Sequence, residues 1–565
     1  MRRYRSSRSG TKDAQERNVQ IESTILNTDT RVSTAKKRRT AMRGSSSWSA
    51  GIAVILGRAA GAVSRRLHLG GGTSIAGVVA QRIYPPIVEH LARQLEHGSL
   101  VVTGTNGKTT TSSFIAAILR DAGLRVWQNR EGSNLTRGVA SALVIRALPN
   151  GRLRRAGKAV AVLEIDEAAL PQVVRMVSPR VAVFTNLFRD QLDRYGEVDS
   201  VVTYWKRALE ILSPETTLVL NADDPSVAYL GTTFTGRVLY YGVDDLSLDL
   251  AHQKDTPTRH QVMDAQTCPR CGSEFIYTAR FYSHMGHYAC PQCGYARPQV
   301  DIRATHVQSD TFDRLRVMIE DTMSTSTQQK EMIIPLPGIY NAYNALAAAT
   351  TALALNVAWE PIISGVEQSK PVFGRGERIQ IEDRTIRLLL AKNPTGFNEV
   401  LRTLFSDSIP KHILFVLNNN IADGRDISWI WDVDFERCVG QVQTLVVAGS
   451  RALDLALRLK YAGIAEKDMT IIPPAPLKLT QKAEARRIQQ QRGKRSEAQK
   501  TVIEQTHTGS TRSLFGLKQA IRVALNNVPV GETLFIVPTY TGLLEVHQEL
   551  EQRGLTPRYW ESRET

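Results

Sequence analysis

The chain contains 565 residues, of which 42% are hydrophobic and 22% are charged, as in a globular protein of three or four domains. Its net charge of +16 comes mainly from two stretches: residues 1–45 supply +8 (12 Lys/Arg, 4 Asp/Glu) and residues 478–500 supply +6 (8 and 2). The remainder is close to neutral, so the basic net charge is not evidence for a nucleic-acid-binding core, and no apolar run approaches the roughly 18 residues that a membrane-spanning helix needs.

Residues 1–47 are rich in Ser, Thr and Arg and lack apolar periodicity, so we expect a disordered basic extension. Two interpretations of it stay open: a solvated tail, or a segment attracted to an anionic membrane surface through the cations at 36–39. Residues 49–66 predict an apolar helix with basic residues at one end. This helix either lies on a membrane or, as we favour, packs on the core. A second helix is predicted over 75–95.

A phosphate-binding loop is the most specific motif of the chain. Residues 99–102 predict a short buried strand, and residues 112–119 open a helix. The predicted nucleotide-binding residues between them are Gly104, Thr105, Asn106, Gly107, Lys108, Thr109 and Thr110. Glycines let backbone N–H groups approach phosphate oxygens, Lys108 would reach the β- and γ-phosphates, and the Thr109 hydroxyl would bind Mg²⁺. The motif is shorter than the full P-loop pattern, because Val102 stands where that pattern has its first glycine.

Short apolar strands alternate with helices after this loop. We predict strands at 159–164, 180–185, 217–220 and 237–241, with helices between them such as 201–212. This alternation is typical of an α/β fold with a mostly parallel sheet and helices on both faces. Ligands bind at the carboxyl ends of such strands. The sequence places four polar clusters there: the phosphate-binding loop, 164–167, 185–186 and 221–224.

The order of these motifs resembles the Mur ligase family, ATP-dependent enzymes that form amide bonds. The resemblance rests on the short phosphate-binding loop, the segment 185–196, the run 221–225, the helix at 339–349 and the turn at 374–378. It implies that Glu164 binds Mg²⁺ and acts in catalysis, that Asn221 and Arg375 lie near ATP, and that Asn344 meets the adenine.

The chain departs from the family pattern at two positions. Gln191 and Tyr340 each replace a histidine that is usual in the family. The loss at Gln191 puts a second metal position in doubt. The acids of these clusters also have a purely structural interpretation, because a carboxylate such as Asp166 can cap the helix that follows it.

Four of the five cysteines form two Cys-x-x-Cys pairs, Cys268 with Cys271 and Cys290 with Cys293. Four thiolates at this spacing suit a tetrahedral Zn²⁺, so we predict an inserted structural zinc ribbon over about 264–298. His284 and His287, between the pairs, are interpreted as loop histidines rather than ligands. This cysteine usage favours a reducing cytoplasm over a disulfide framework.

The α/β pattern resumes from about residue 385 in the C-terminal part. Strands are predicted at 386–391, 413–417, 444–447 and 534–537. Two loops, 391–398 and 418–432, are dense in polar and charged residues, as functional loops are, and both begin where strands end. Residues 473–512 predict a solvated basic insertion, with a nucleic-acid role as the alternative.

The cysteine tetrad and the segments 392–401 and 423–436 together resemble the MurT type of Mur ligase, the synthetase subunits of lipid II isoglutaminyl synthases. The resemblance implies ATP-dependent amidation of the glutamate α-carboxyl of the peptidoglycan stem peptide on lipid II, through an acyl phosphate. Ammonia would come from a GatD-type glutaminase subunit. Asp423 or Asp426 of this chain would complete the catalytic Cys–His pair of that subunit. For either residue, the alternative is a structural role as an acid within the turn. Cys438 is interpreted as a core thiol, so we expect no glutaminase activity in this chain alone.

We therefore expect an extension at 1–47, a central ATP-binding domain at 48–372 and a C-terminal domain at 373–565. The expected protein is a cytoplasmic ligase that uses ATP, Mg²⁺ and Zn²⁺, and that contacts the inner face of the membrane through a lipid-linked substrate. Two other functions stay open. One is a Mur-family ligase that adds an amino acid; the other is a zinc-ribbon NTPase acting on nucleic acid, which the basic tail and insertion favour and the lack of a helicase-like acidic motif opposes.

Overall fold

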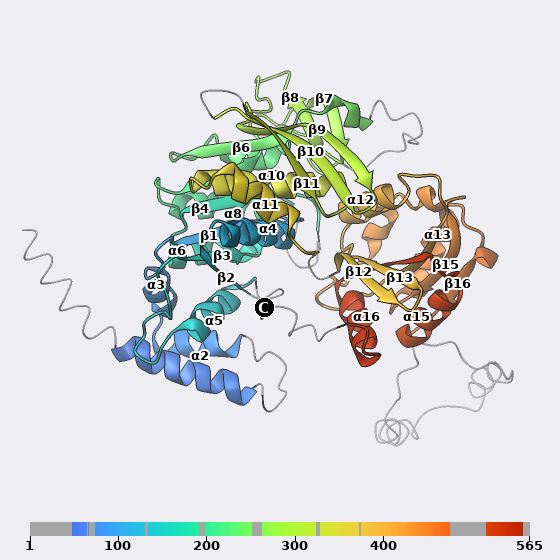
Figure 1. The fold of residues 1–565 in the computed structure, drawn as a ribbon. Coiled ribbons are helices and arrows are strands. Elements are labelled where there is room, and N and C mark those ends of the chain that lie inside the picture. The colour runs from blue at the N-terminus through green and yellow to red at the C-terminus, as the bar shows by residue number, and fades with distance from the viewer. Residues whose placement is uncertain are drawn as a thin grey trace, which may run out of the picture. The chain divides into compact units, whose positions relative to one another are not determined.

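The computed structural model describes residues 48–64, 66, 74–129, 134–190, 198–250, 263–323, 328–371, 374–474 and 516–556. The predicted extension at 1–47, nearly all of the insertion at 473–512, and Gln191 lie outside these ranges. The described residues fall into two compact units, one from residues 1–98 and 129–159 and one from 99–128 and 160–565 (Figure 1). None of their helices is long and apolar enough to cross a membrane.

The first unit is helical where it is described. It contains a helix at 48–64 together with α2 (Ile75–Ile83), α3 (Ile87–Ala92) and α5 (Thr136–Arg146). The single helix predicted over 75–95 is wrong, because Pro85 and Pro86 interrupt it. Proline lacks the backbone N–H that continues a helix, and it pushes the preceding residue into an extended conformation. Tyr84 accordingly has an extended backbone.

The second unit contains a nine-stranded sheet in the order β11-β10-β9-β6-β5-β4-β1-β3-β2. Its strands are β1 (Ser99–Thr103), β2 (Arg125–Gln128), β3 (Ala159–Glu164), β4 (Val181–Phe184), β5 (Thr217–Asn221), β6 (Val238–Val243), β9 (Ile302–Thr311), β10 (Arg314–Asp321) and β11 (Gln328–Ile334). The pairs from β3 across to β9 are parallel, as predicted, and β9, β10 and β11 are antiparallel. The mostly parallel sheet is therefore confirmed, and an antiparallel extension is added to it.

Helices cover this sheet. They are α4 (Lys108–Asp121), α6 (Leu170–Val177), α8 (Val198–Ile211), α9 (Pro225–Leu230), α10 (Ile339–Ala354) and α11 (Trp359–Glu367). The alanines of α10 are buried in one core with α4, α11 and the strands, because small side chains allow close helix packing. A two-stranded hairpin, β7 (Ile276–Tyr282) and β8 (Met285–Ala289), inserts Phe281 and Met285 into the same core.

The C-terminal part contains a six-stranded sheet in the order β12-β13-β17-β14-β15-β16. The strands are β12 (Arg375–Ile381), β13 (Arg384–Leu389), β14 (Lys411–Val416), β15 (Val442–Ala448), β16 (Met469–Ile472) and β17 (Thr533–Pro538); the helices are α12 (Pro394–Leu404), α13 (Ala452–Tyr461), α15 (Leu517–Asn526) and α16 (Tyr540–Gln552). The edge strand β12 pairs antiparallel with β13, and the pairs from β13 across to β16 are parallel. Two buried clusters, one with α12 and α13 and one with α15 and α16, fill its two faces.

Candidate active site and metal centre

The phosphate-binding loop lies where the carboxyl ends of β1, β3, β4 and β5 meet. Because these strands are parallel neighbours, segments that are distant in sequence come into contact there. The amide of Thr105 donates to the carbonyl of Asn186 at 2.9 Å, and the amide of Asn106 donates to the Asn186 side chain at 2.8 Å. Asn221 in turn donates to the carbonyl of Thr185 at 3.0 Å. Three of the predicted polar clusters are thus joined by direct hydrogen bonds.

Two glycines give the loop its shape. Gly104 and Gly107 have φ angles of +133° and +84°, which favour glycine over residues with a side chain. A Cβ atom at Gly104 would collide with the Thr185 hydroxyl, and one at Gly107 would collide with the side-chain oxygen of Asn344. The loop therefore fits closely against its two neighbours.

Lys108 is buried and surrounded by oxygen atoms. Its Nζ donates to the carbonyl of Gly104 and lies 2.8 Å from the Glu167 carboxylate. Burial lowers the pKa of Lys108, but the carboxylates of Glu167, Asp166 and Glu164 outweigh burial and raise the pKa above the ordinary lysine value. Lys108 therefore carries its positive charge within the predicted phosphate-binding loop.

Glu164 ends β3 directly beside β1, where it pairs in register with Val102. Asp166 accepts a hydrogen bond from the amide of Ala168 and caps the short helix that begins at Glu167, so the structural interpretation of Asp166 is confirmed. Glu167, which the sequence analysis left without a role, is the closest carboxylate partner of Lys108 given by the structure. Its position three residues beyond the strand end was the available signal.

Asn344, on α10, is buried behind the loop. It accepts a hydrogen bond from the Thr111 hydroxyl at 3.2 Å and donates to Asn341 at 3.0 Å. Arg375, at the start of β12, donates to the Thr110 hydroxyl at 3.4 Å, while its buried Nε has no hydrogen-bond partner among the described residues. The structure thus brings both predicted residues to the first turn of α4. Contact with adenine or phosphate stays a prediction.

The first C-terminal loop also reaches the phosphate-binding loop. Asn393 donates to the side-chain oxygen of Asn106 at 3.0 Å, and Lys392 forms an ion pair with Asp190 at 2.5 Å. Asn393 also caps α12 by accepting a hydrogen bond from the amide of Gly396. The sequence marked this loop as functional but assigned no partner to it, because a contact between residues almost 300 positions apart leaves no local pattern.

The two candidate acids of the second C-terminal loop differ in exposure. Asp423 is buried and accepts hydrogen bonds from the amide and the hydroxyl of Thr541, in the first turn of α16. Asp426 is exposed and accepts from the amide and the hydroxyl of Ser428 at 2.8 and 2.9 Å. Asp426 is therefore the acid that another protein can reach.

The four cysteines gather as predicted. Their sulfur atoms lie within 4.8 Å of one another, with Cys268 and Cys293 separated by 3.6 Å and Cys271 and Cys290 by 3.4 Å. Tetrahedral Zn²⁺ with bonds of about 2.3 Å requires sulfur separations of about 3.8 Å. The four-thiol set therefore fits Zn²⁺, and it is the only group of its kind in the part of the chain that the structure describes.

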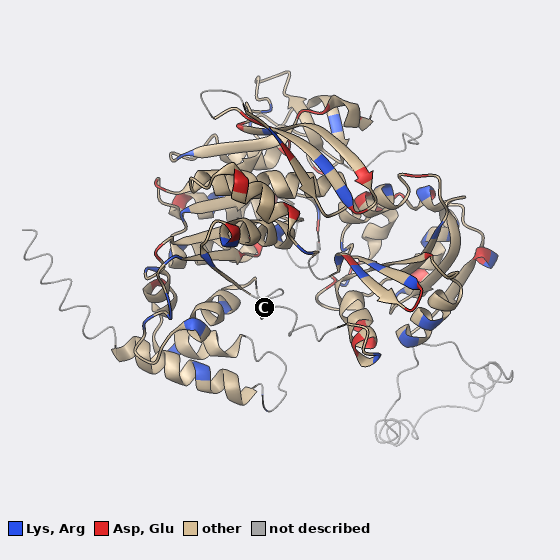
Figure 2. Ribbon diagram, viewed as in Figure 1, with Lys and Arg blue, Asp and Glu red and all other residues tan. Residues whose placement is uncertain are grey.

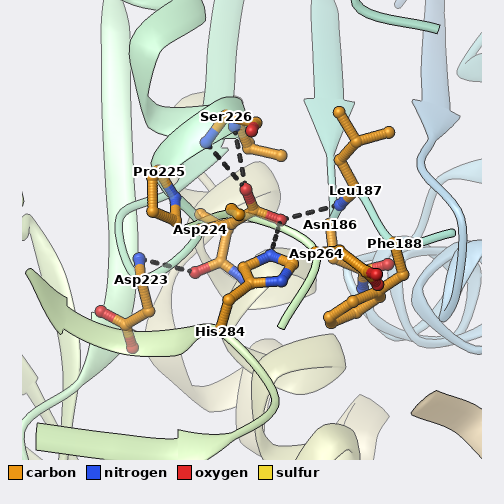
Figure 3. Close-up of polar contacts among 12 residues, drawn as sticks. Asn186, Leu187, Phe188, Asp223, Asp224, Pro225, Ser226, Asp264 and His284 are labelled. Carbon is orange, nitrogen blue, oxygen red and sulfur yellow. Dashed lines mark hydrogen bonds and ion pairs between the residues drawn. The ribbon is translucent and has the colours of Figure 1, made fainter. Parts of the chain in front are cut away.

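A buried contact between a histidine and a carboxylate connects this ribbon to the end of β5 (Figure 3). His284 lies in the turn between β7 and β8, as predicted, and is fully buried, whereas His287, also expected in a loop, lies within strand β8. The Nε2 of His284 is 3.2 Å from the carboxylate of Asp224, which also accepts hydrogen bonds from the amides of Leu187, Ser226 and Val227. Asp224 thus holds the loop after β4, the start of α9 and the tip of the ribbon together.

The neighbouring Asp223 makes a second connection. It pairs with Arg297 at 2.5 Å and accepts a hydrogen bond from the hydroxyl of Tyr343 on α10 at 2.6 Å. Its carbonyl also accepts from the amide of Gly286 in β8. The Asn-Ala-Asp-Asp run was expected to lie near the nucleotide. Its first residue, Asn221, donates a hydrogen bond to Thr185 beside the phosphate-binding loop, whereas Asp223 makes structural contacts to the ribbon and to α10.

Comparison with known proteins identifies the family. The Mur ligase middle domain matches residues 102–276, and the MurT ligase C-terminal domain matches residues 390–509. The chain is 34% identical over 414 residues to the subunit MurT of lipid II isoglutaminyl synthase (glutamine-hydrolyzing) from Staphylococcus aureus strain COL, covering 73% of this chain and 87% of that protein. The chain belongs to the MurT family.

Other similarities agree with this family. The MurT subunit of Streptococcus pneumoniae strain ATCC BAA-255 / R6 is 33% identical over 404 residues, or 71% of this chain and 85% of that protein. Among solved structures, MurF from Acinetobacter baumannii has a TM-score of 0.54 at 16% identity, covering 84% of this chain and 80% of MurF. A pseudomurein peptide ligase type C from Methanothermus fervidus has a TM-score of 0.53 at 24% identity, covering 81% and 79%. These structures establish that the MurT-family chain has the Mur ligase fold.

Proposed function

We propose that this chain is the synthetase subunit of a lipid II isoglutaminyl synthase. It amidates the glutamate α-carboxyl of the peptidoglycan stem peptide on lipid II, using ATP and ammonia. Relatives with this named activity match most of the chain. The observation that carries the proposal is the buried, charged Lys108 in a glycine-shaped loop at the carboxyl ends of four parallel strands.

The proposed reaction has two steps. The substrate carboxylate attacks the γ-phosphorus of ATP, so that an acyl phosphate forms and ADP leaves. Ammonia then attacks the acyl carbon, the carbon–nitrogen bond forms, and the bond to phosphate breaks. Lys108 offsets the negative charge that develops on the phosphoryl oxygens. Phosphate must first replace Glu167 and the Gly104 carbonyl as the partners of Lys108.

Two metal ions fit the residues present. Thr109 and Glu164 would hold Mg²⁺, which supplies charge neutralisation for the phosphates when it is bound. Cys268, Cys271, Cys290 and Cys293 would hold Zn²⁺ in a closed, structural site. Lys392 and Asn393, which contact Asp190 and Asn106, would keep the C-terminal part over the phosphate-binding loop and limit hydrolysis of the acyl phosphate.

Ammonia would come from a GatD-type glutaminase subunit. The one cysteine outside the ribbon, Cys438, is fully buried, and burial together with Asp434 and Glu436 raises the pKa of its thiol well above the ordinary value. A protonated, inaccessible thiol cannot attack glutamine. We assign the exposed Asp426, rather than the buried Asp423, to the catalytic Cys–His pair of the glutaminase.

The helix α13 offers a surface for this partner. Leu453, Leu457 and Tyr461 recur at every fourth position along α13 and are 65%, 51% and 72% exposed. Trp431, which follows the Asp426 loop, contacts Tyr461 edge-to-face and is itself half exposed. Exposed apolar and aromatic side chains of this kind are typical of protein–protein interfaces. The enzyme would act at the inner face of the membrane, where a lipid-linked substrate lies.

An amidation assay tests the proposal. The purified chain receives ATP, Mg²⁺ and a muropeptide, with either ammonium or glutamine as the nitrogen source. We expect amidated product from ammonium alone and none after Lys108→Met. Product from glutamine would contradict the division of labour between subunits. No amidation, but ligation when amino acids are supplied, would instead favour the amino-acid ligase, and ATP hydrolysis stimulated only by DNA or RNA would favour the nucleic-acid NTPase.

A further inference from the structure

The helix at 48–64 leaves a large apolar stripe in contact with solvent. Trp48, Ile52, Ile55, Leu56 and Val63 are between 49% and 80% exposed. They recur at spacings of three, four and seven residues, apart from the adjacent pair 55–56, so they share one side of the helix. No charged residue lies within 48–64 except Arg58, whose guanidinium donates to the carbonyl of Ala147. Single exposed apolar residues are common, but a continuous stripe of five indicates a binding surface.

The packing of the opposite side fixes this orientation. Ala50, Ala53 and Val54 are fully buried in the first unit. A Cβ atom at Gly51 would lie 2.5 Å from the carbonyl oxygen of Pro149, and one at Gly57 would lie 2.5 Å from the carbonyl oxygen of Ala76. Only the small-residue side fits these neighbours, so the helix cannot rotate to bury its large side chains.

The unit that carries the stripe is strongly basic. Its described residues contain ten Lys/Arg and only two acids, Glu89 and Glu96, which gives +8. In Figure 2 the helix at 48–64, α2 and α5 carry blue segments and no red ones. The sequence that runs directly into the helix, residues 1–47, adds twelve Lys/Arg against four acids. The net charge of the folded chain is therefore near neutral as a whole, although the first unit is strongly basic.

We propose that the helix at 48–64 docks this protein on an anionic lipid bilayer, with the apolar stripe at the boundary between headgroups and acyl chains. An apolar stripe with surrounding cations matches a surface whose headgroups are negative and whose interior is apolar. A protein partner of matching chemistry would need its own acidic rim around an apolar groove. The inference deepens the proposed function, on which it rests for its biological purpose, because a lipid-linked substrate lies in such a bilayer.

Vesicle binding tests the inference without any catalytic step. The full chain is sedimented with vesicles of phosphatidylcholine, with or without phosphatidylglycerol. We expect binding to the anionic vesicles, and we expect the double variant Ile52→Ser/Leu56→Ser to lower the partition coefficient about tenfold or more. Ile409→Ser/Val530→Ser, which replaces two similarly exposed apolar residues of the C-terminal part, is the matched control and should bind like the parent chain.

Three results would overturn the inference. The parent chain could fail to bind anionic vesicles. The stripe variant could bind as well as the parent, which would assign binding to the basic residues alone. The parent could form a dimer that the stripe variant loses, which would assign the stripe to a second copy of the chain. Amidation of a water-soluble muropeptide is measured in parallel: binding without amidation removes the proposed function and keeps the surface, while unchanged amidation by the stripe variant shows that it is folded.

Discussion

The pair formed by Asp224 and His284 makes a quantitative prediction about how the ribbon and the nucleotide site depend on each other. Replacing Asp224 with Asn keeps the shape but removes the charge and turns one acceptor oxygen into a donor. Whichever way the side-chain amide of the new Asn is turned, its NH₂ group replaces an acceptor. Either Leu187, or both Ser226 and Val227, then lose the acceptor of their backbone N–H groups. A buried donor left without an acceptor costs about 1–3 kcal/mol, so one or two amides without an acceptor account for a loss of about 3 kcal/mol. We expect Asp224→Asn to cost about 3 kcal/mol locally.

Hydrogen exchange at the amides of Leu187, Ser226 and Val227 measures this cost where it arises. Since about 1.4 kcal/mol corresponds to a factor of ten, either the Leu187 amide or the other two should exchange roughly 100-fold faster in Asp224→Asn. His284→Ala leaves the hydrogen bonds of all three backbone amides to Asp224 in place, so it should accelerate their exchange less. His306→Ala, which removes a histidine that is 53% exposed and pairs with Asp245, is the control and should leave Leu187 unchanged. If Asp224→Asn exchanges no faster than the control, Asp224 does not hold these segments together.

Four further predictions concern other parts of the molecule. Lys392→Met should lower kcat for amidation at least tenfold while ATP turnover without acceptor is unchanged or higher, because its contact with Asp190 no longer helps to keep the C-terminal part over the phosphates; equal kcat would contradict this role. In the complex with a glutaminase, Asp426→Asn should abolish glutamine-dependent but not ammonium-dependent amidation, whereas Asp423→Asn should lower the melting temperature instead, since it frees Thr541; the reverse pattern would exchange the two assignments. Cys271→Ser should reduce bound zinc measured by mass spectrometry, and a full zinc content would show that the metal is elsewhere. Cys438 should resist alkylation at pH 8 in the native protein, because its raised pKa keeps the thiol protonated; rapid alkylation would refute its burial.

The sequence predicted those elements whose signal is local. The strand, loop and helix around Lys108 and the four cysteine positions depend on short patterns, and the structure confirms both. The break between α2 and α3 also has a local signal, Pro85 and Pro86, which the helix predicted over 75–95 did not take into account. By contrast, the ion pair between Lys108 and Glu167 joins two segments that only the parallel pairing of β1 and β3 brings together.

Other parts of the site could not be predicted for the same reason. His284 was correctly placed in a loop, but its partner Asp224 is 60 residues earlier in the chain and shares no motif with it. The contact of Asn393 with Asn106 depends on how two separate sheets pack. The strands β9 to β11 escaped prediction because their outward-facing positions are polar and charged, which is typical of a sheet face in contact with water.

The position of the ribbon in the chain has a consequence for folding. Strands β6 and β9 are parallel neighbours, and residues 244–301, which include the whole ribbon, form the crossover between them. Until that crossover is complete, β6 is the last paired strand and presents an open edge of unpaired N–H and C=O groups, a template for aggregation. Zinc supply during synthesis would therefore decide whether β9, β10 and β11 close that edge in time, so that starvation for zinc should appear first as insoluble chains and only later as a less active enzyme.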